Sequence, residues 1–153
     1  MENTSKTNEK TIEILDRLIT ILDDGKLGYT NAAEDVDCNQ AKTDFLGYAR
    51  ERALFIVELQ DEINKLGKST NTAGGPMGAI HRAWIDIKSL VTGGDKEAII
   101  NACITGEKAA IEEYEDALNE EHLNTSLRPL ILKQLASIKT TLAKIEMEKK
   151  TLT

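Results

Sequence analysis

Proline and cysteine are scarce in this chain, and long apolar runs are absent. Two prolines and 29% charged residues favour helix over sheet. The two cysteines, Cys38 and Cys103, form no Cys-x-x-Cys or Cys/His spacing, so no zinc site is signalled. No apolar run approaches the roughly 18 residues that a membrane span needs, and the start, Met1–Lys10, lacks a hydrophobic signal region. We therefore expect a cytoplasmic protein with free thiols and no membrane partner.

An excess of positive charge is absent as well. The formal net charge is −7 and the sequence pI is about 4.9. Nucleic acids and anionic membranes attract proteins through basic patches, so this acidic balance argues against both as partners. A chain of 153 residues with 41% apolar residues suits one domain with one packed core, covering residues 1–153.

What the chain has instead is a helical repeat of apolar residues, three and four positions apart. This spacing predicts a first helix over about 8–36. The pair Asp37 and Gln40 has the spacing of a capping box and predicts the start of a second helix. That helix is expected to end near residue 66, with Gly67 as its C-terminal stop.

The remaining segments predict two more long helices and one short one. Residues 1–7 are expected to be disordered, and residues 67–76 to form a crossover loop rich in Gly, Ser, Thr and Asn. A short helix is predicted over about 77–91. Asp95 is the expected N-cap of a helix that reaches about residue 121.

The last predicted helix runs to the C-terminus, with Ser126 as its expected cap and Pro129 in its first turn. The order of elements is two long helices, a crossover that contains a short helix, and two more long helices. This order predicts an all-α four-helix bundle with one long connection, for which the ferritin-like fold is the main soluble example. We expect the first two helices to be the longest.

Several segments carry a resemblance to a known family. They are Asp24-Gly-Lys-Leu-Gly-Tyr29, Ala32-Ala-Glu-Asp35, Arg50-Glu-Arg-Ala53, Glu58-Leu59, Gly78-Ala-Ile-His-Arg-Ala-Trp84, Thr92-Gly-Gly-Asp95, Gly106-Glu107 and Tyr114-Glu-Asp-Ala117. In this order they resemble an uncharacterised bacterial family of ferritin-like, rubrerythrin-related proteins, over about residues 9–148. The resemblance implies a four-helix bundle, and it implies no established activity.

The metal ligands of such bundles are mostly missing here. A di-iron bundle holds its ions with one glutamate from each of two helices and a Glu-x-x-His pair from each of the other two. The resemblance to rubrerythrin-like proteins places these six ligands at Leu22, Ala49, Arg52, Glu107, Gln134 and Ser137. Only Glu107 matches the expected acid, and Glu-x-x-His occurs nowhere in the chain. We therefore expect no cofactor, with iron or another divalent metal as the alternative.

Arg52 lies in the apolar face of its predicted helix, and a buried guanidinium must be paired. We predict an internal polar network in which Arg52, Glu107, Glu113 and Gln134 converge where the metals would be. One alternative is that Arg52 snorkels to the edge of the bundle while its stem packs inside. The other is a metal site with an altered shell, whose candidate ligands are Glu58, Glu107, Glu113 and His81.

A second candidate site lies on the predicted short helix, where His81, Trp84 and Lys88 share one face. One interpretation is a surface site for an anion or a protein partner, with Trp84 as its anchor. The alternative is that Trp84 closes the crossover onto the bundle and His81 lies at its rim.

These observations favour one class of function and leave one alternative. The missing ligand set favours a non-enzymatic structural or interaction protein, and the resemblance implies a connection with stress physiology. Its expected partner is another copy of the chain, through the bundle faces. The alternative is a metal-binding ferritin-like oxidoreductase or metal-handling protein, di-iron or mononuclear, with an altered ligand set.

Overall fold

The structure is a computed structural model that describes residues 2–67 and 96–151, with side chains from residue 6 onward. Its elements are α1 (Glu2–Asp35), α2 (Asn39–Lys65), α4 (Lys96–Leu118), the 3-10 turn η1 (Thr125–Leu127) and α5 (Arg128–Thr151). These two ranges contain no strand, so the prediction of an all-helical chain is confirmed for them. With 34 and 27 residues, α1 and α2 are the longest of the described helices, as predicted.

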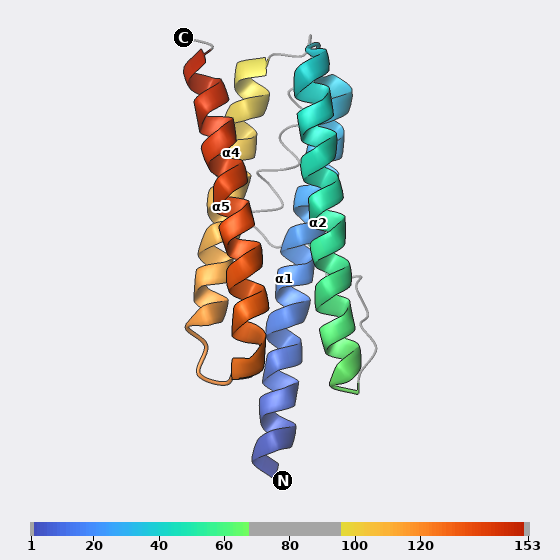
Figure 1. The fold of residues 1–153 in the computed structure, drawn as a ribbon, viewed down its shortest axis with the longest axis vertical. Helices are drawn as coiled ribbons and strands as arrows, with labels where there is room; N and C mark the ends of the chain where they lie inside the picture. Colours follow the sequence, from blue (N-terminus) through green and yellow to red (C-terminus); the bar gives the residue numbers. More distant parts are fainter. Residues whose placement is uncertain (1, 68–95, 152–153) are drawn as a thin grey trace.

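The helices form a bundle of two antiparallel pairs (Figure 1). α1 packs along α2, α4 packs along α5, and α1 also contacts α4. In the view of Figure 1, α1 and α5 run upward, whereas α2 and α4 run downward. Because α2 and α4 are parallel, the connection between them joins opposite ends of the bundle. The described helices therefore make a four-helix bundle with one long connection.

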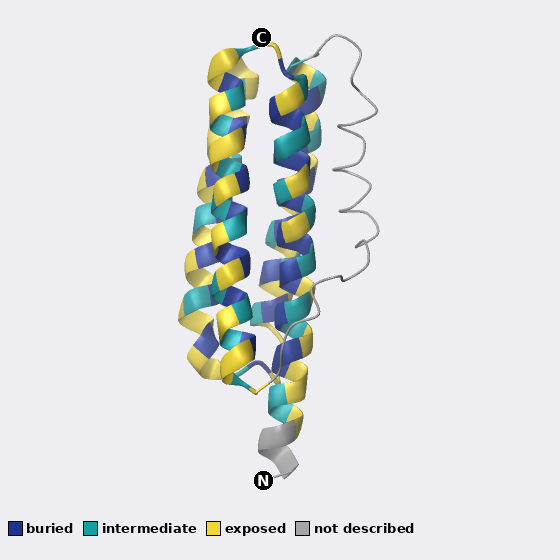
Figure 2. Ribbon diagram, turned by 90° about the vertical axis from the view of Figure 1, so that its right-hand side faces the viewer, coloured by how far each residue is buried: buried dark blue, intermediate teal, exposed yellow. Residues whose placement is uncertain are grey.

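Each helix turns one stripe of buried side chains toward the bundle axis (Figure 2). Among the most deeply buried apolar residues are Leu15, Leu22, Phe45, Leu59, Ile100, Cys103, Ile131 and Ile138. Burying one large apolar side chain is worth about 1.5–3 kcal/mol relative to leaving it exposed. Most of the stability of these helices therefore comes from this shared core rather than from helix propensity.

Two predicted helix starts differ from the structure. α1 already begins at Glu2, although residues 1–7 were expected to be disordered, because no glycine or proline interrupts the first turns. The capping box at Asp37 is wrong. The N-cap of α2 is Cys38, which makes no side-chain capping bond, and Gln40 Nε2 donates instead to Asp44 Oδ1 at 3.0 Å. Asp37 therefore lies one residue before the N-cap and outside the helix.

The end of α2 follows the prediction. Gly67 has a φ of +86°, a left-handed conformation that glycine adopts without strain, and its N–H donates to the Asn64 carbonyl at 3.0 Å. The predicted short helix over 77–91, the N-cap at Asp95 and most of the 67–76 loop lie outside the described residues.

The connection from α4 to α5 begins earlier than predicted. α4 ends at Leu118 rather than near residue 121. Ser126 is not the cap of α5. Asn124 caps the η1 turn by accepting from the Ser126 N–H at 3.0 Å, and α5 then begins at Arg128 with Pro129 in its first turn. Asn124 and proline together therefore set this boundary.

Thr11 of α1 fastens the same connection to the bundle. Its side chain is fully buried. The hydroxyl donates to the His122 carbonyl at 3.2 Å and accepts from the Asn124 N–H at 3.1 Å. One threonine thus satisfies two backbone groups that no helix pairs.

Candidate functional site

The candidate site is an ion pair inside the bundle. Arg52 comes from α2 and Glu107 from α4, two helices that lie diagonally across the bundle from each other (Figure 1). Arg52 Nη2 donates to Glu107 Oε2. The two side chains are only 2% and 1% exposed. The pair therefore joins opposite helices through the core, away from solvent.

Two residues of α1 make room for the guanidinium. Gly25 faces it, and a Cβ built at Gly25 would lie 3.6 Å from Arg52 Nε. The ring of Tyr29 lies on the same helix, with Arg52 Cζ 5.8 Å from the ring centroid, within the range of a cation–π contact. Arg52 thus packs against bare backbone and against an aromatic ring. This explains why a helix interior tolerates a glycine here.

Tyr29 in turn belongs to an aromatic cluster next to the ion pair. Its ring centroid lies 6.0 Å from that of Phe45 and 5.3 Å from that of Tyr48, which meets it edge to face. Burial raises the pKa of Tyr29 well above its usual value, and the charge of Glu107 adds to this shift. Tyr29 therefore stays protonated at neutral pH.

Burial and pairing act in opposite directions on the two charges. Burial lowers the pKa of Arg52, but the charge of Glu107 and its hydrogen bond overcome this effect, so the net shift is upward and the guanidinium stays charged. Burial raises the pKa of Glu107, and the charge and hydrogen bond of Arg52 reduce that rise. Each group is therefore tolerated in the core because the other is present.

The pairing is incomplete. Arg52 Nη1 and Glu107 Oε1 are buried and make no regular hydrogen bond within the described part of the chain, although the Tyr29 hydroxyl interacts with the Glu107 carboxylate and lowers its pKa. The contact is thus made through one nitrogen and one oxygen rather than through the two parallel bonds of a bidentate pair. Unmet buried polar atoms cost stability, so the Coulomb attraction of the pair has to offset them.

A second polar network lies beside the ion pair and joins three helices. The Tyr114 hydroxyl of α4 donates to Gln134 Oε1 of α5 at 2.7 Å. Gln134 Nε2 lies 3.1 Å from Glu58 Oε1 and 3.4 Å from the Phe55 carbonyl, both on α2. Gln134 is completely buried, and these contacts satisfy its amide. Burial raises the pKa of Tyr114, so this hydroxyl remains a donor.

The structure therefore brings together only part of the predicted network. Arg52 contacts Glu107 and does not snorkel to the edge. Gln134 lies in the adjacent network. Glu113 is not part of either, because its position on α4 faces α1 rather than the bundle axis. It accepts from Arg17 instead, at 2.8 Å to Nε and 3.1 Å to Nη2, in a partly exposed pair.

The sequence analysis assigned no polar role to Tyr114. A signal was present, because Tyr114 follows Glu107 by seven residues and so shares its helix face. It also missed that Ser137 donates to Glu51 at 2.7 Å, a second polar contact between α5 and α2. His81, Trp84 and Lys88 lie outside the described residues.

Within the described ranges, no three His, Cys, Asp or Glu side chains gather in a way that could hold a metal ion. The carboxylate of Glu107, which lies in the bundle core, is paired with Arg52. The carboxylate of Glu58 accepts a hydrogen bond from Gln134. The ligand positions Leu22 and Ala49 are buried apolar side chains.

Two comparisons extend this description. The model of a family described as a domain of unknown function (DUF2383) matches residues 10–120, which include α1, α2 and α4 with Arg52 and Glu107. No curated protein matches the chain. In the described residues, no helix is both long and apolar enough to cross a membrane.

Proposed function

We propose that this chain, which belongs to the DUF2383 family, is a ferritin-like bundle whose metal centre is replaced by a fixed ion pair, and that it works as a non-enzymatic structural or interaction protein. The order and direction of the helices support the ferritin-like part of the proposal, because such bundles have one long crossover connection. The resemblance of several segments to rubrerythrin-related proteins supports it further.

The observation that carries the functional part is the buried Arg52. A divalent metal about 4 Å from this guanidinium would be repelled by about 8 kcal/mol at an effective dielectric constant of about 20. Arg52 also forms an ion pair with Glu107, the one acid that matches an expected ligand position. A metal ion would therefore have to displace the arginine and leave its charge unpaired in the core, which is costly.

The chemistry of the neighbouring groups supports a non-enzymatic role. The thiol of Cys103 lies one turn before Glu107, and burial raises its pKa, so it remains a protonated and unreactive thiol. The pKa values of Tyr29 and Tyr114 are raised as well. His122, the one histidine among the described residues, is exposed in the α4–α5 connection. The buried thiol and the two buried phenols are therefore not poised as nucleophiles or bases at neutral pH.

Metal analysis tests this proposal. The protein is produced in medium supplemented with iron and manganese and is purified without chelators. We expect inductively coupled plasma mass spectrometry to find far less than one metal ion per chain. Glu107→Gln is the matched control, because it removes the one acid at a ligand position. About one or two ions per wild-type chain that disappear in Glu107→Gln would overturn the proposal and favour a metalloprotein with an altered ligand set.

A further inference from the structure

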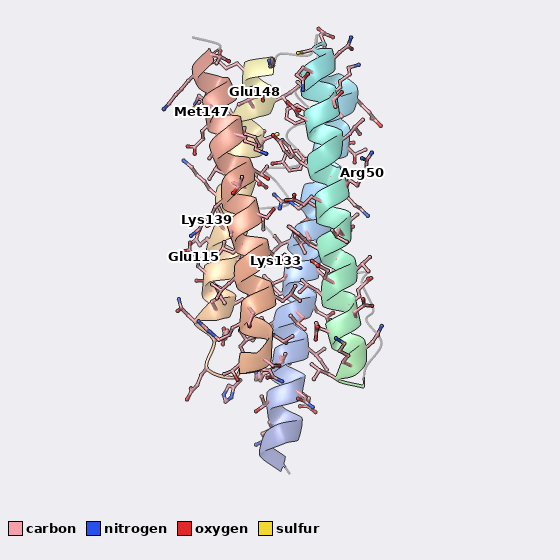
Figure 3. The ribbon with its side chains drawn as sticks, viewed as in Figure 1. Arg50, Glu115, Lys133, Lys139, Met147 and Glu148 are labelled. Carbon is pink, nitrogen blue, oxygen red and sulfur yellow. The ribbon has the colours of Figure 1, made fainter. Side chains whose placement is uncertain are left out.

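The outer face of α2 carries apolar side chains that nothing in the described bundle covers. Leu46, Leu54 and Val57 are 47%, 57% and 51% exposed. Two charged residues lie on the same face, Arg50 and Asp61, and within the described residues neither makes an ion pair. Figure 3 shows Arg50 projecting away from the bundle.

The order of these residues along α2 is self-complementary. Arg50 and Asp61 are eleven residues apart, which is about three helical turns, so they share one face. Leu54 and Val57 lie between them. If a second α2 lies antiparallel to the first, with a twofold axis between residues 55 and 56, Leu54 meets Val57 of the other copy. The same axis brings Arg50 opposite Asp61, and symmetry makes each contact twice.

A groove borders this face. It has a volume of about 310 Å³ and lies between α1 and α2. Its α2 wall consists of Ala53, Ile56, Val57 and Gln60. Its α1 wall consists of Ile19, Asp23 and Lys26. Val57 belongs both to this groove and to the outer face of α2, so a second copy that covers the face also covers the edge of the groove.

We propose that the outer face of α2 is an isologous interface, through which two copies of the chain form an antiparallel, symmetric dimer. This inference deepens the interaction role proposed above and names the partner as a second copy. A single helix face is small compared with the roughly 800 Å² per partner of a stable complex. The dimer is therefore weak, with a dissociation constant in the micromolar range or above, and it depends on protein concentration.

Charge swaps followed by sedimentation velocity test this interface. Arg50→Asp places two pairs of acids across the twofold axis, and Asp61→Arg places two pairs of cations there, so each single variant is expected to be monomeric where wild type is partly dimeric. The double variant Arg50→Asp/Asp61→Arg restores opposite charges and should dimerise again. An equimolar mixture of the two single variants should form a heterodimer for the same reason.

Two controls keep the result specific. Lys139→Asp reverses an exposed cation on α5, on the other side of the bundle from Arg50 in Figure 3, and should leave the dimer unchanged. Circular dichroism of every variant checks that it is folded, which we expect because all three positions are exposed.

Several outcomes would overturn the inference. A wild-type protein that stays monomeric at high concentration excludes the second copy as occupant of this face. A dimer that survives both single swaps lies on another surface, and a double variant that stays monomeric excludes the antiparallel register. Metal content is measured separately, so a metal-loaded dimer refutes only the proposed function, and a metal-free monomer refutes only this interface.

Discussion

Replacing Arg52 with methionine tests the buried ion pair directly. Methionine keeps much of the volume of the stem and removes the charge, which leaves the Glu107 carboxylate in the core at 1% exposure without its cation. Breaking a buried pair from one side costs about 3–5 kcal/mol, because the remaining charge has no partner. For a domain of this size such a loss lowers the melting temperature by about 6–20 °C. Thermal and urea unfolding, followed by circular dichroism, measure it.

A double-mutant cycle separates the charge effect from the packing effect. Glu107→Gln leaves the arginine unpaired and should also destabilise the fold. Arg52→Met/Glu107→Gln removes both charges, so its loss should be smaller than the sum of the two single losses by more than about 1 kcal/mol. The matched control is the exposed pair of Arg17 and Glu113. Arg17→Met should cost less than about 1 kcal/mol, since exposed ion pairs contribute little.

The pH dependence of the Arg52→Met variant provides a second measurement. In the wild type, burial raises the pKa of Glu107 and Arg52 opposes that rise. Without Arg52 the folded-state pKa rises further above its unfolded value. The folded state then binds the proton more tightly, so the stability of the variant relative to wild type falls as pH rises above about 4.5. Equal losses for Arg52→Met and Arg17→Met, no coupling in the cycle, and no pH dependence would together refute the reasoning.

Three further measurements follow from the structure. All three tyrosines have raised pKa values, with Tyr48 at about 12, so a spectrophotometric titration of the folded protein should show no phenolate near pH 10, and stability should fall as pH rises above about 10. Gly47→Ala should stabilise the fold by up to about 1 kcal/mol because its Cβ meets nothing within 4 Å, whereas Gly67→Ala should destabilise it because φ is +86°. Thr11→Val should cost about 1–3 kcal/mol and speed hydrogen exchange at the Asn124 amide; an unchanged exchange rate would contradict the assigned contact.

The sequence alone determined the helical architecture and the direction of Arg52. Apolar residues three and four positions apart have only one way to be buried together, on one face of a helix. Arg52 falls within that face on α2, so its inward position follows from periodicity. The end of α2 at Gly67 was also predictable from the sequence, because a helix commonly ends at a residue in the left-handed conformation and glycine adopts it without strain.

The first residue of each helix was harder to predict from the sequence, because several neighbouring residues can act as the N-cap. Asp37 and Ser126 have capping side chains, yet the helices begin at other residues. Alternative caps differ by only about 1 kcal/mol. At the start of α5, packing of the α4–α5 connection against α1, through Thr11, is large enough to decide between them.

Only the tertiary structure decided which acid Arg52 meets. Periodicity limits the candidates on α4 to those near its inner face, and Glu107 and Glu113 both met that condition from sequence. The choice depends on the rotation of α4 about its own axis, which is set by its packing against α1 and α5. That rotation turns Glu107 toward the bundle axis and Glu113 toward Arg17 on α1. Rotating a helix about its own axis leaves the interactions within that helix unchanged. The pattern of residues along one helix therefore does not predict this rotation.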